Sequence, residues 1–333
     1  RLLDSARYDV QRIEQALLQP KKNEAFVVYN TLPWARSGVV EIAWSATLPG
    51  NVLLDESGRI VPTQVLPDGR RILVARNVPA RGARRYRLSR MDSPPPGEEI
   101  APVFQAAHDP ETGAIASLIV KEREWLRPGP YGGLLQAVYV AGQDPARFYL
   151  SKLRQEWTIN GPVVRRWQAR ATLEGANEVR YEMSQYRGLD LLHLAVAIDK
   201  KSVRDKEALH IAFPFRLDSA TVRVGVGDAW ISPEEGQIPG ANRDFFSVQR
   251  WIDVSGPSAG VTLSCPQAAL FELGAPIDER PLRRERKIWL DRNASSPLLF
   301  LYAMNNYWHT NYKADQSGPV RFDIYLRFHG PFD

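Results

Sequence analysis

The sequence predicts an all-β protein, a large antiparallel β-sandwich with one short N-terminal helix and a smaller accessory β-unit. Hydrophobic residues recur with a period of two over most of the chain, as they do in strands with one buried face. Turn-forming sequences separate these runs, and 25 prolines and 23 glycines are spread along the length. Because helical periodicity is missing between the runs, stacked antiparallel sheets are favoured over alternating strands and helices.

The first 18 residues are the exception to this period. Their apolar residues are three and four positions apart, which places them on one face of a helix. These residues are Leu2, Ala6, Val10, Ile13 and Leu17. No capping Ser, Thr or Asp precedes them, and residue 1 is Arg rather than Met. We therefore expect residues 1–18 to be the tail of a helical segment and the chain to be part of a longer protein.

Strand alternation is clearest near the end of the chain. There, one set of alternating residues is apolar: Val320, Phe322, Ile324, Leu326 and Phe328. The other set is mostly polar: Arg321, Asp323, Tyr325, Arg327 and His329. Residues 39–44 and 192–199 also alternate with a period of two. Each run predicts a strand with one face in a core.

A proline-rich stretch divides the chain. Residues 91–101 include three consecutive prolines, which favour an extended and semi-rigid connection. We expect them to link a small β-sandwich unit, residues 25–90, to a large β-domain, residues 102–333.

Composition argues against several classes of function. The net charge is +5 over 333 residues, and the densest basic run, residues 283–287, is interrupted by a glutamate, so no nucleic-acid partner is expected. No run of about 18 apolar residues is present, so no membrane partner is expected. The single Cys265 excludes an intramolecular disulfide and favours a reducing compartment such as a bacterial cytoplasm.

Catalytic motifs are weak in this sequence. Residues 256–260 match the G-x-S-x-G pattern of serine hydrolases, but they lie between two β-runs and predict a strand-to-strand turn. The five histidines show no metal-binding spacing. His193, His210 and His329 fall on the polar side of predicted strands, where they would face solvent or form hydrogen bonds. Paired carboxylates are defined by separation in space and cannot be found in the sequence.

Two segments mix aromatic side chains with amides. The first is Asp244–Val254, and the second is Asn305–Lys313, which holds three aromatic residues and three asparagines. Sugar sites use this mixture, because flat rings cover the C–H faces of pyranoses and amides bond the hydroxyls. The alternative is that the aromatic residues fill a core and the asparagines form turns, and composition alone favours that alternative.

At these segments the sequence resembles the C-terminal β-region of glycoside hydrolase family 38 α-mannosidases. The resemblance rests on six stretches in the same order along the chain: Tyr29–Trp34, Lys206–Phe215, Asp244–Ser255, Gly260–Ser264, Tyr302–Tyr312 and Phe322–His329. It implies a parent with an α/β barrel, a helical segment and a β-region related to galactose-mutarotase-like supersandwiches. It also implies cleavage of α-mannosides with retention, by an aspartate nucleophile and a zinc ion held by Asp and His. Those groups belong to the barrel, so no catalytic or metal-binding residue is assigned here.

The resemblance implies that loops of this β-region close over the sugar cleft. The candidates are Gly236–Arg243 and Asn305–Asn311. In this interpretation Arg243 bonds sugar hydroxyls, Trp308 stacks on a sugar ring, and Asn306 or Asn311 orients the substrate. The stretch ending in Arg243 matches the family only loosely.

The leading hypothesis is the C-terminal β-domain of an α-mannosidase-like retaining glycoside hydrolase, inactive alone. Its partners would be an α-mannoside or related carbohydrate and the parent's own barrel. One alternative is a stand-alone carbohydrate-binding or structural β-sandwich. A further alternative, a self-contained mutarotase-type epimerase, would need a histidine and a partnering glutamate on one sheet. His193 and His210 are available for it, but no spacing supports them.

Overall fold

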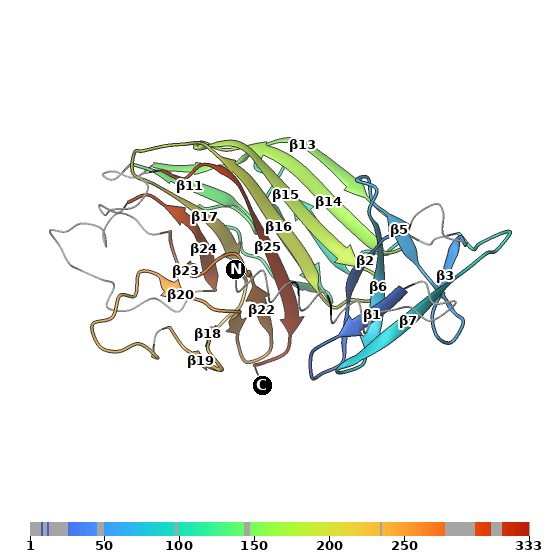
Figure 1. Ribbon diagram of the computed structural model, residues 1–333. Helices are drawn as coiled ribbons and strands as arrows, with labels where there is room; N and C mark the ends of the chain where they lie inside the picture. Colours follow the sequence, from blue (N-terminus) through green and yellow to red (C-terminus); the bar gives the residue numbers. More distant parts are fainter. Residues whose placement is uncertain are drawn as a thin grey trace. The chain divides into compact units, whose positions relative to one another are not determined.

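The computed structural model describes residues 8, 12, 26–44, 50–96, 99–142, 147–233, 235–276, 297–307 and 315–332. Strands dominate, and no described residue from position 26 onward lies in an α-helix (Figure 1). Tyr8 and Arg12, the two described residues of the predicted N-terminal helix, are both helical. Among the described residues, no helix has the length and apolar character needed to cross a membrane. The prediction of an all-β fold with a short N-terminal helix is confirmed.

The chain forms two compact units. The first lies within Arg1–Ile100 and also includes two short segments, Asn160–Arg165 and Tyr186–Leu189. The second contains the rest of Ala101–Asp333. Each unit has its own hydrophobic core.

The first unit consists of two antiparallel sheets. Four strands have the order β1-β7-β3-β4, with bounds Phe26–Asn30, Gly82–Ser89, Val52–Leu54 and Ile60–Val61. Three strands have the order β2-β6-β5, with bounds Arg36–Ile42, Arg71–Val78 and Thr63–Val65. Side chains from both sheets form the core: Ile42, Leu53, Leu73, Ala75, Val78 and Tyr86.

A tight turn at residues 55–58 joins β3 to β4. The Oδ1 atom of Asp55 accepts hydrogen bonds from the backbone N–H groups of Ser57 and Arg59, at 2.9 Å each. Gly58 has φ of +81°, a conformation that favours glycine. The Asp-x-x-Gly pattern therefore fixes this hairpin through local chemistry.

The second unit contains a nine-stranded, a six-stranded and a three-stranded antiparallel sheet. The nine-stranded order is β13-β14-β15-β16-β25-β22-β21-β18-β19, with bounds Lys152–Ile159, Val164–Thr172, Ala176–Tyr186, Leu192–Lys200, Gly318–His329, Gly260–Ser264, Ile252–Ser255, Thr221–Val226 and Ala229–Ile231. The six-stranded order is β12-β11-β17-β24-β23-β20, with bounds Arg147–Leu150, Ala137–Ala141, Glu207–Pro214, Leu298–Asn305, Leu270–Leu273 and Phe246–Ser247. The three-stranded order is β10-β9-β8, with bounds Arg123–Glu124, Ile115–Val120 and Phe104–His108.

The main core of this unit receives one face of each large sheet. From β25 it takes Phe322, Ile324, Leu326 and Phe328, and from β16 it takes Leu192, Leu194, Val196 and Ile198. The two strands pair directly, so these residues form adjoining rows. The alternation predicted for both strands is confirmed. Val320 is an exception, because its side chain is 38% exposed at the start of β25.

Residues 244–254 form two strands in different sheets. Phe246 pairs with Phe271 in the six-stranded sheet, whereas Ile252 pairs with Leu263 in the nine-stranded sheet. The chain passes from one sheet to the other between these points. Residues 256–260 then form the predicted strand-to-strand turn between β21 and β22, so the G-x-S-x-G match is a hairpin.

Candidate functional site

The six-stranded sheet has a second apolar cluster on the face that points away from the main core. Leu209 and Ile211 of β17 lie in the main core, so Ala208 and His210 point to the opposite face. Four buried residues, Val140, Ala208, Tyr302 and Tyr307, form the cluster there, and the partly buried Phe245 and Leu270 pack against them; we call these six residues the outer cluster. Phe245 comes from the first aromatic–amide segment and Tyr307 from the second. The structure therefore brings the two segments together.

Asn306, in the second segment, is bonded to the backbone of a neighbouring connection. Its Nδ2 donates to the carbonyl oxygens of Val203 and Asp205, at 3.2 Å each. Its backbone N–H donates to the backbone carbonyl oxygen of Glu207 at 2.7 Å. These hydrogen bonds hold the connection between β16 and β17 against the end of β24. They support the alternative in which Asn306 has a structural role in a turn.

Replacing Asn306 with alanine should lower the free energy of unfolding by about 1–2 kcal/mol, because two backbone carbonyls lose their side-chain donor. Chemical denaturation followed by tryptophan fluorescence measures this. Asn177→Ala is a matched control, since Asn177 Nδ2 donates to Asp199 Oδ2 at an exposed position, and it should change stability by under about 0.5 kcal/mol. Equal effects of the two substitutions would contradict a structural role for Asn306.

Of the other predicted site residues, one lies beside the first aromatic–amide segment and two lie outside the described residues. Arg243 is partly buried and directly precedes Asp244, whose backbone N–H donates to Asn242 Oδ1 at 2.8 Å. Trp308 and Asn311 lie outside the described residues. Sugar contacts by Arg243, Trp308 and Asn311 therefore remain predictions.

A histidine–glutamate pair lies beneath the outer cluster. Nε2 of His210 is 2.9 Å from Oε2 of Glu272, and neither side chain is more than 1% exposed. The His210 ring stacks on Tyr302 with centroids 4.6 Å apart. Acid–base catalysis needs contact between such a pair and the substrate, and this burial prevents contact. The pair therefore does not support the self-contained epimerase, and His210 is a buried residue rather than a solvent-facing one.

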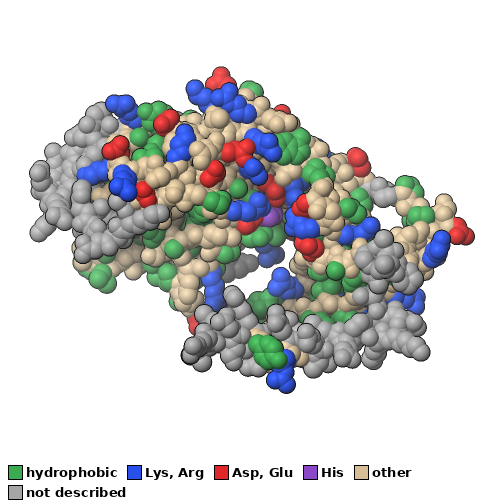
Figure 2. All heavy atoms as spheres, turned by 45° about the horizontal axis from the view of Figure 1, so that its top comes forward, with side chains coloured by type: hydrophobic (Ala, Val, Ile, Leu, Met, Phe, Trp, Pro, Cys, Tyr) green, Lys and Arg blue, Asp and Glu red, His purple; other side chains and the backbone are tan. Residues whose placement is uncertain are grey.

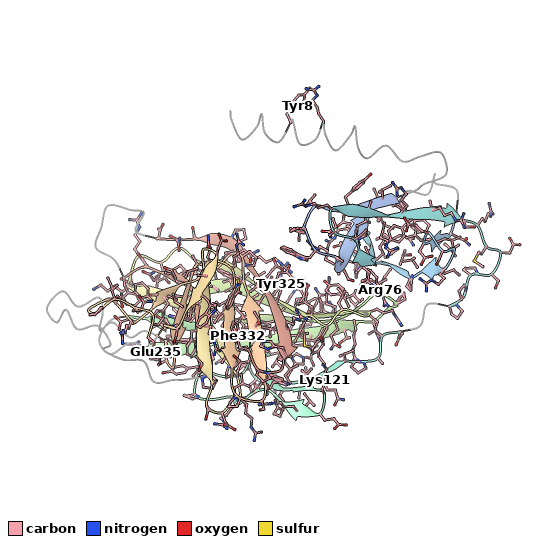
Figure 3. All side chains as sticks on the ribbon, turned by 90° about the horizontal axis from the view of Figure 1, so that it is seen from below. Tyr8, Arg76, Lys121, Glu235, Tyr325 and Phe332 are labelled. Carbon is pink, nitrogen blue, oxygen red and sulfur yellow. The ribbon has the colours of Figure 1, made fainter. Side chains whose placement is uncertain are left out.

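The outward side of the nine-stranded sheet carries a polar network. Nε2 of His193 lies 2.9 Å from Asp323 Oδ1, and its ring stacks on Tyr325, which is labelled in Figure 3. Arg321 lies 2.9 Å from Asp323 and 3.6 Å from Glu182. We call these five residues the nine-strand face. Figure 2 shows acidic and basic side chains side by side over this part of the molecule, with a histidine among them.

Burial and charge set the protonation of the nine-strand face. Burial lowers the pKa of His193, and the hydrogen bond with Asp323 only partly opposes it. Burial acts to raise the pKa of Asp323, but hydrogen bonds from Arg321 and His193 outweigh it and lower the pKa. At neutral pH the face therefore presents an ionised carboxylate, a neutral imidazole and an aromatic ring, groups that can bond and cover a sugar.

The nine-strand face has no local signal in the sequence. His193 and Asp323 are 130 residues apart, and adjacent strands β16 and β25 bring them together. The sequence shows polar residues at alternate positions along both strands, but it does not show that the two strands pair. A second histidine–aspartate pair lies in the same sheet. Nε2 of His329, in β25, is 2.8 Å from Oδ2 of Asp253, in β21.

No group of three or more His, Cys, Asp or Glu that could hold a metal ion occurs among the described residues. The zinc implied by the resemblance was expected in a catalytic barrel. None of its ligands was assigned to this chain.

Comparisons with known proteins show the fold. No protein-family model and no curated protein sequence matches this chain. A solved protein in glycosyl hydrolase family 38 from Enterococcus faecalis aligns with a TM-score of 0.60 and 12% identity, covering 94% of this chain and 45% of that chain. An α-mannosidase from Enterococcus faecalis V583 aligns with a TM-score of 0.61 and 14% identity, covering 97% of this chain and 45% of that chain.

A weaker match is a galactose mutarotase-like protein from Lactobacillus casei ATCC 334, with a TM-score of 0.35 and 12% identity over 70% of this chain and 99% of that chain. That TM-score is too low to support a conclusion. The first two matches confirm the fold expected from the resemblance. The chain spans less than half the length of both of them.

Proposed function

We propose that this chain is the β-region of an α-mannosidase-like retaining glycoside hydrolase, in which it supports a catalytic barrel and completes the sugar cleft. One observation carries the proposal. Nearly the whole chain, 94–97%, shares its fold with less than half of a family 38 chain and less than half of an α-mannosidase chain. The order of the sequence stretches that resemble the family agrees with this.

In this proposal the present residues position the substrate and do not break the bond. Retaining cleavage needs a carboxylate nucleophile and an acid about 5–5.5 Å apart on either side of the glycosidic bond. We assign that pair, and the zinc that would polarise the sugar, to the barrel. The outer cluster would hold the loops at Asn242–Phe245 and Asn305–Tyr307 in place, so that they can close the cleft.

An assay with an activated aryl α-mannoside and added zinc tests whether this chain lacks the residues that break the glycosidic bond. We expect no turnover above the rate with heat-denatured chain, because the interactions that lower the barrier lie elsewhere. A family 38 enzyme run in parallel shows that the assay works. Saturable, enzyme-like turnover by this chain would overturn the proposal.

A sugar titration separates this role from a stand-alone carbohydrate-binding module. A β-region that only completes a cleft should show no saturable binding of mannosides by calorimetry at millimolar sugar. Clear affinity would favour the binding module. Since the nine-strand face places the Asp323 carboxylate and the Tyr325 ring on either side of His193, Asp323→Asn should then weaken that affinity.

A further inference from the structure

Three aromatic side chains meet at one end of the nine-stranded sheet, and we call them the edge aromatic group. Trp230 comes from the last strand, β19, Trp251 directly precedes β21, and Phe332 follows β25. The Phe332 ring, labelled in Figure 3, contacts both of the others, with its centroid 5.8 Å from that of Trp230 and 6.2 Å from that of Trp251. The fold thus joins three rings that are far apart in the sequence.

The two tryptophans lie on the outward face of the sheet. Val224 and Ile252 belong to the main core, so their neighbours in the chain, Gly225 and Trp251, point to the opposite face. Trp230 is paired directly with Gly225 across β18 and β19, and paired residues share one side of a sheet. Gly225 therefore lies between the two tryptophans.

Gly225 allows the Trp251 indole to lie flat on the sheet. A β-carbon at Gly225 would come within 2.7, 2.8 and 3.0 Å of Nε1, Cε2 and Cδ1 of that indole. Because these three atoms of one five-membered ring would be almost equally distant, one face of the ring covers Gly225 and the other points away from the sheet. The Gly225 N–H also donates to the Trp251 carbonyl at 2.9 Å, which fixes the backbone beside the ring.

Arg223 supports the other two rings. Its guanidinium carbon lies 4.4 Å from the centroid of Phe332 and 5.5 Å from that of Trp230, so cation–π attraction holds both rings against it. One guanidinium nitrogen donates to Ser255 Oγ at 2.8 Å and lies 3.8 Å from Asp253 Oδ1. The rings are therefore positioned before a ligand binds, which reduces the entropy lost on binding.

The edge aromatic group is nevertheless open to solvent. Trp230 is 50% exposed, and the residues beside it, Asp228, Gln249 and Arg250, are exposed and polar. Gln249 accepts a hydrogen bond from the Gly227 N–H with its Oε1, and its Nε2 has no hydrogen-bond partner among the described residues. A stable protein interface needs about 800 Å² from each partner. Three rings within a polar rim are much smaller and fit a sugar better than a protein.

We propose that the edge aromatic group binds a glycan whose pyranose rings carry only equatorial substituents, such as β-1,4-linked glucose. Such a ring has two flat C–H faces, and either can stack on an indole. An α-linked mannose has an axial hydroxyl at C2 and an axial glycosidic bond, which hold its ring away from a flat aromatic surface. This site takes a different sugar from the α-mannoside of the function proposed above and does not depend on that function.

Calorimetric titration of the whole chain with cellopentaose tests the proposal, and α-1,2-linked mannobiose is the comparison sugar. We expect saturable binding of cellopentaose and none of mannobiose at the same millimolar concentrations. Trp230→Ala should weaken cellopentaose binding by about 10-fold, because it removes the exposed stacking surface. Trp34→Ala is the matched control, since Trp34 is 59% exposed in the first unit, and it should leave binding within about 2-fold.

The assignment is wrong if any of four results is obtained. They are no saturable binding of cellopentaose, mannobiose binding as tightly, equal binding by wild type and Trp230→Ala, and an equal loss of binding for Trp34→Ala. Circular dichroism checks that each variant folds. If Trp230→Ala does not fold, Phe332→Ala provides the test, because Phe332 follows the last strand and binding should still fall several-fold. The aryl α-mannoside assay tests the function proposed above separately.

Discussion

Replacing Lys200 with methionine should lower the free energy of unfolding of the second unit by about 3–5 kcal/mol. Lys200 Nζ lies 2.8 Å from Glu207 Oε2, and the two side chains are 5% and 0% exposed. The hydroxyl of Tyr139 donates to the same oxygen at 2.6 Å. Without the ammonium group, a buried carboxylate would keep only the tyrosine as a hydrogen-bond donor. An uncompensated buried charge is far more costly than the absence of the whole pair.

Chemical denaturation measures this loss, and two variants isolate its cause. Lys201→Met changes the adjacent, exposed lysine and should cost less than about 0.5 kcal/mol. The double variant Lys200→Met with Glu207→Leu removes both charges and should recover much of the lost stability. If Lys200→Met lowers the free energy of unfolding no more than Lys201→Met does, the Lys200–Glu207 pair contributes little to stability.

The loss of stability caused by Lys200→Met should also depend on pH. Burial raises the pKa of Glu207, while hydrogen bonds from Lys200 and Tyr139 oppose it. A raised folded pKa means that the folded state takes up the proton more readily, so the contribution of Glu207 to stability falls as pH rises through this range. Without Lys200 the pKa should rise further. The difference between wild type and Lys200→Met should therefore shrink as the pH is lowered.

The all-β fold could be predicted because its signals are local. The alternation along β25 and the Asp55–Gly58 turn depend on neighbouring residues, and hydrophobic burial and turn chemistry decide both. The strand break within residues 244–254 was not visible. Phe246, Val248, Ile252 and Val254 all have apolar surroundings, although they lie in or beside two different sheets.

The candidate sites were less predictable, because they depend on strand pairing. His210 and Glu272 are 62 positions apart and meet only because β17 and β23 both flank β24. Composition pointed to the two segments that supply Phe245 and Tyr307 to the outer cluster. It could not show that the Asn306 side chain donates to backbone carbonyls in the connection at residues 201–206. A cavity in the first unit, lined by Arg59, Arg76, Arg84 and Arg187 among others, has no sequence signal of its own, since these arginines lie far apart along the chain.

Lowering the pH from 7 to 4 should cost the second unit about 3 kcal/mol through His108 alone. Burial is the main reason that its pKa is lowered from 6.5 to about 4, and the charge of Glu156 opposes this only in part. The ring stacks on Trp167 with centroids 3.6 Å apart. Because the folded pKa is below the unfolded one, His108 contributes full stability above about pH 6.5 and loses it as the pH falls through 4.

His108→Phe isolates this effect. Phenylalanine keeps an aromatic ring against Trp167 but cannot take up a proton, so its stability should fall less steeply between pH 6.5 and 4 than that of wild type. Denaturation midpoints measured across this range give the two slopes, and carboxylates other than Glu156, whose charge acts on His108, contribute equally to both. His108→Ala should show the same shallow slope at lower stability throughout, because it also lacks the stacked ring. Parallel curves for wild type and His108→Phe would mean that His108 is protonated as easily in the folded chain as in the unfolded one.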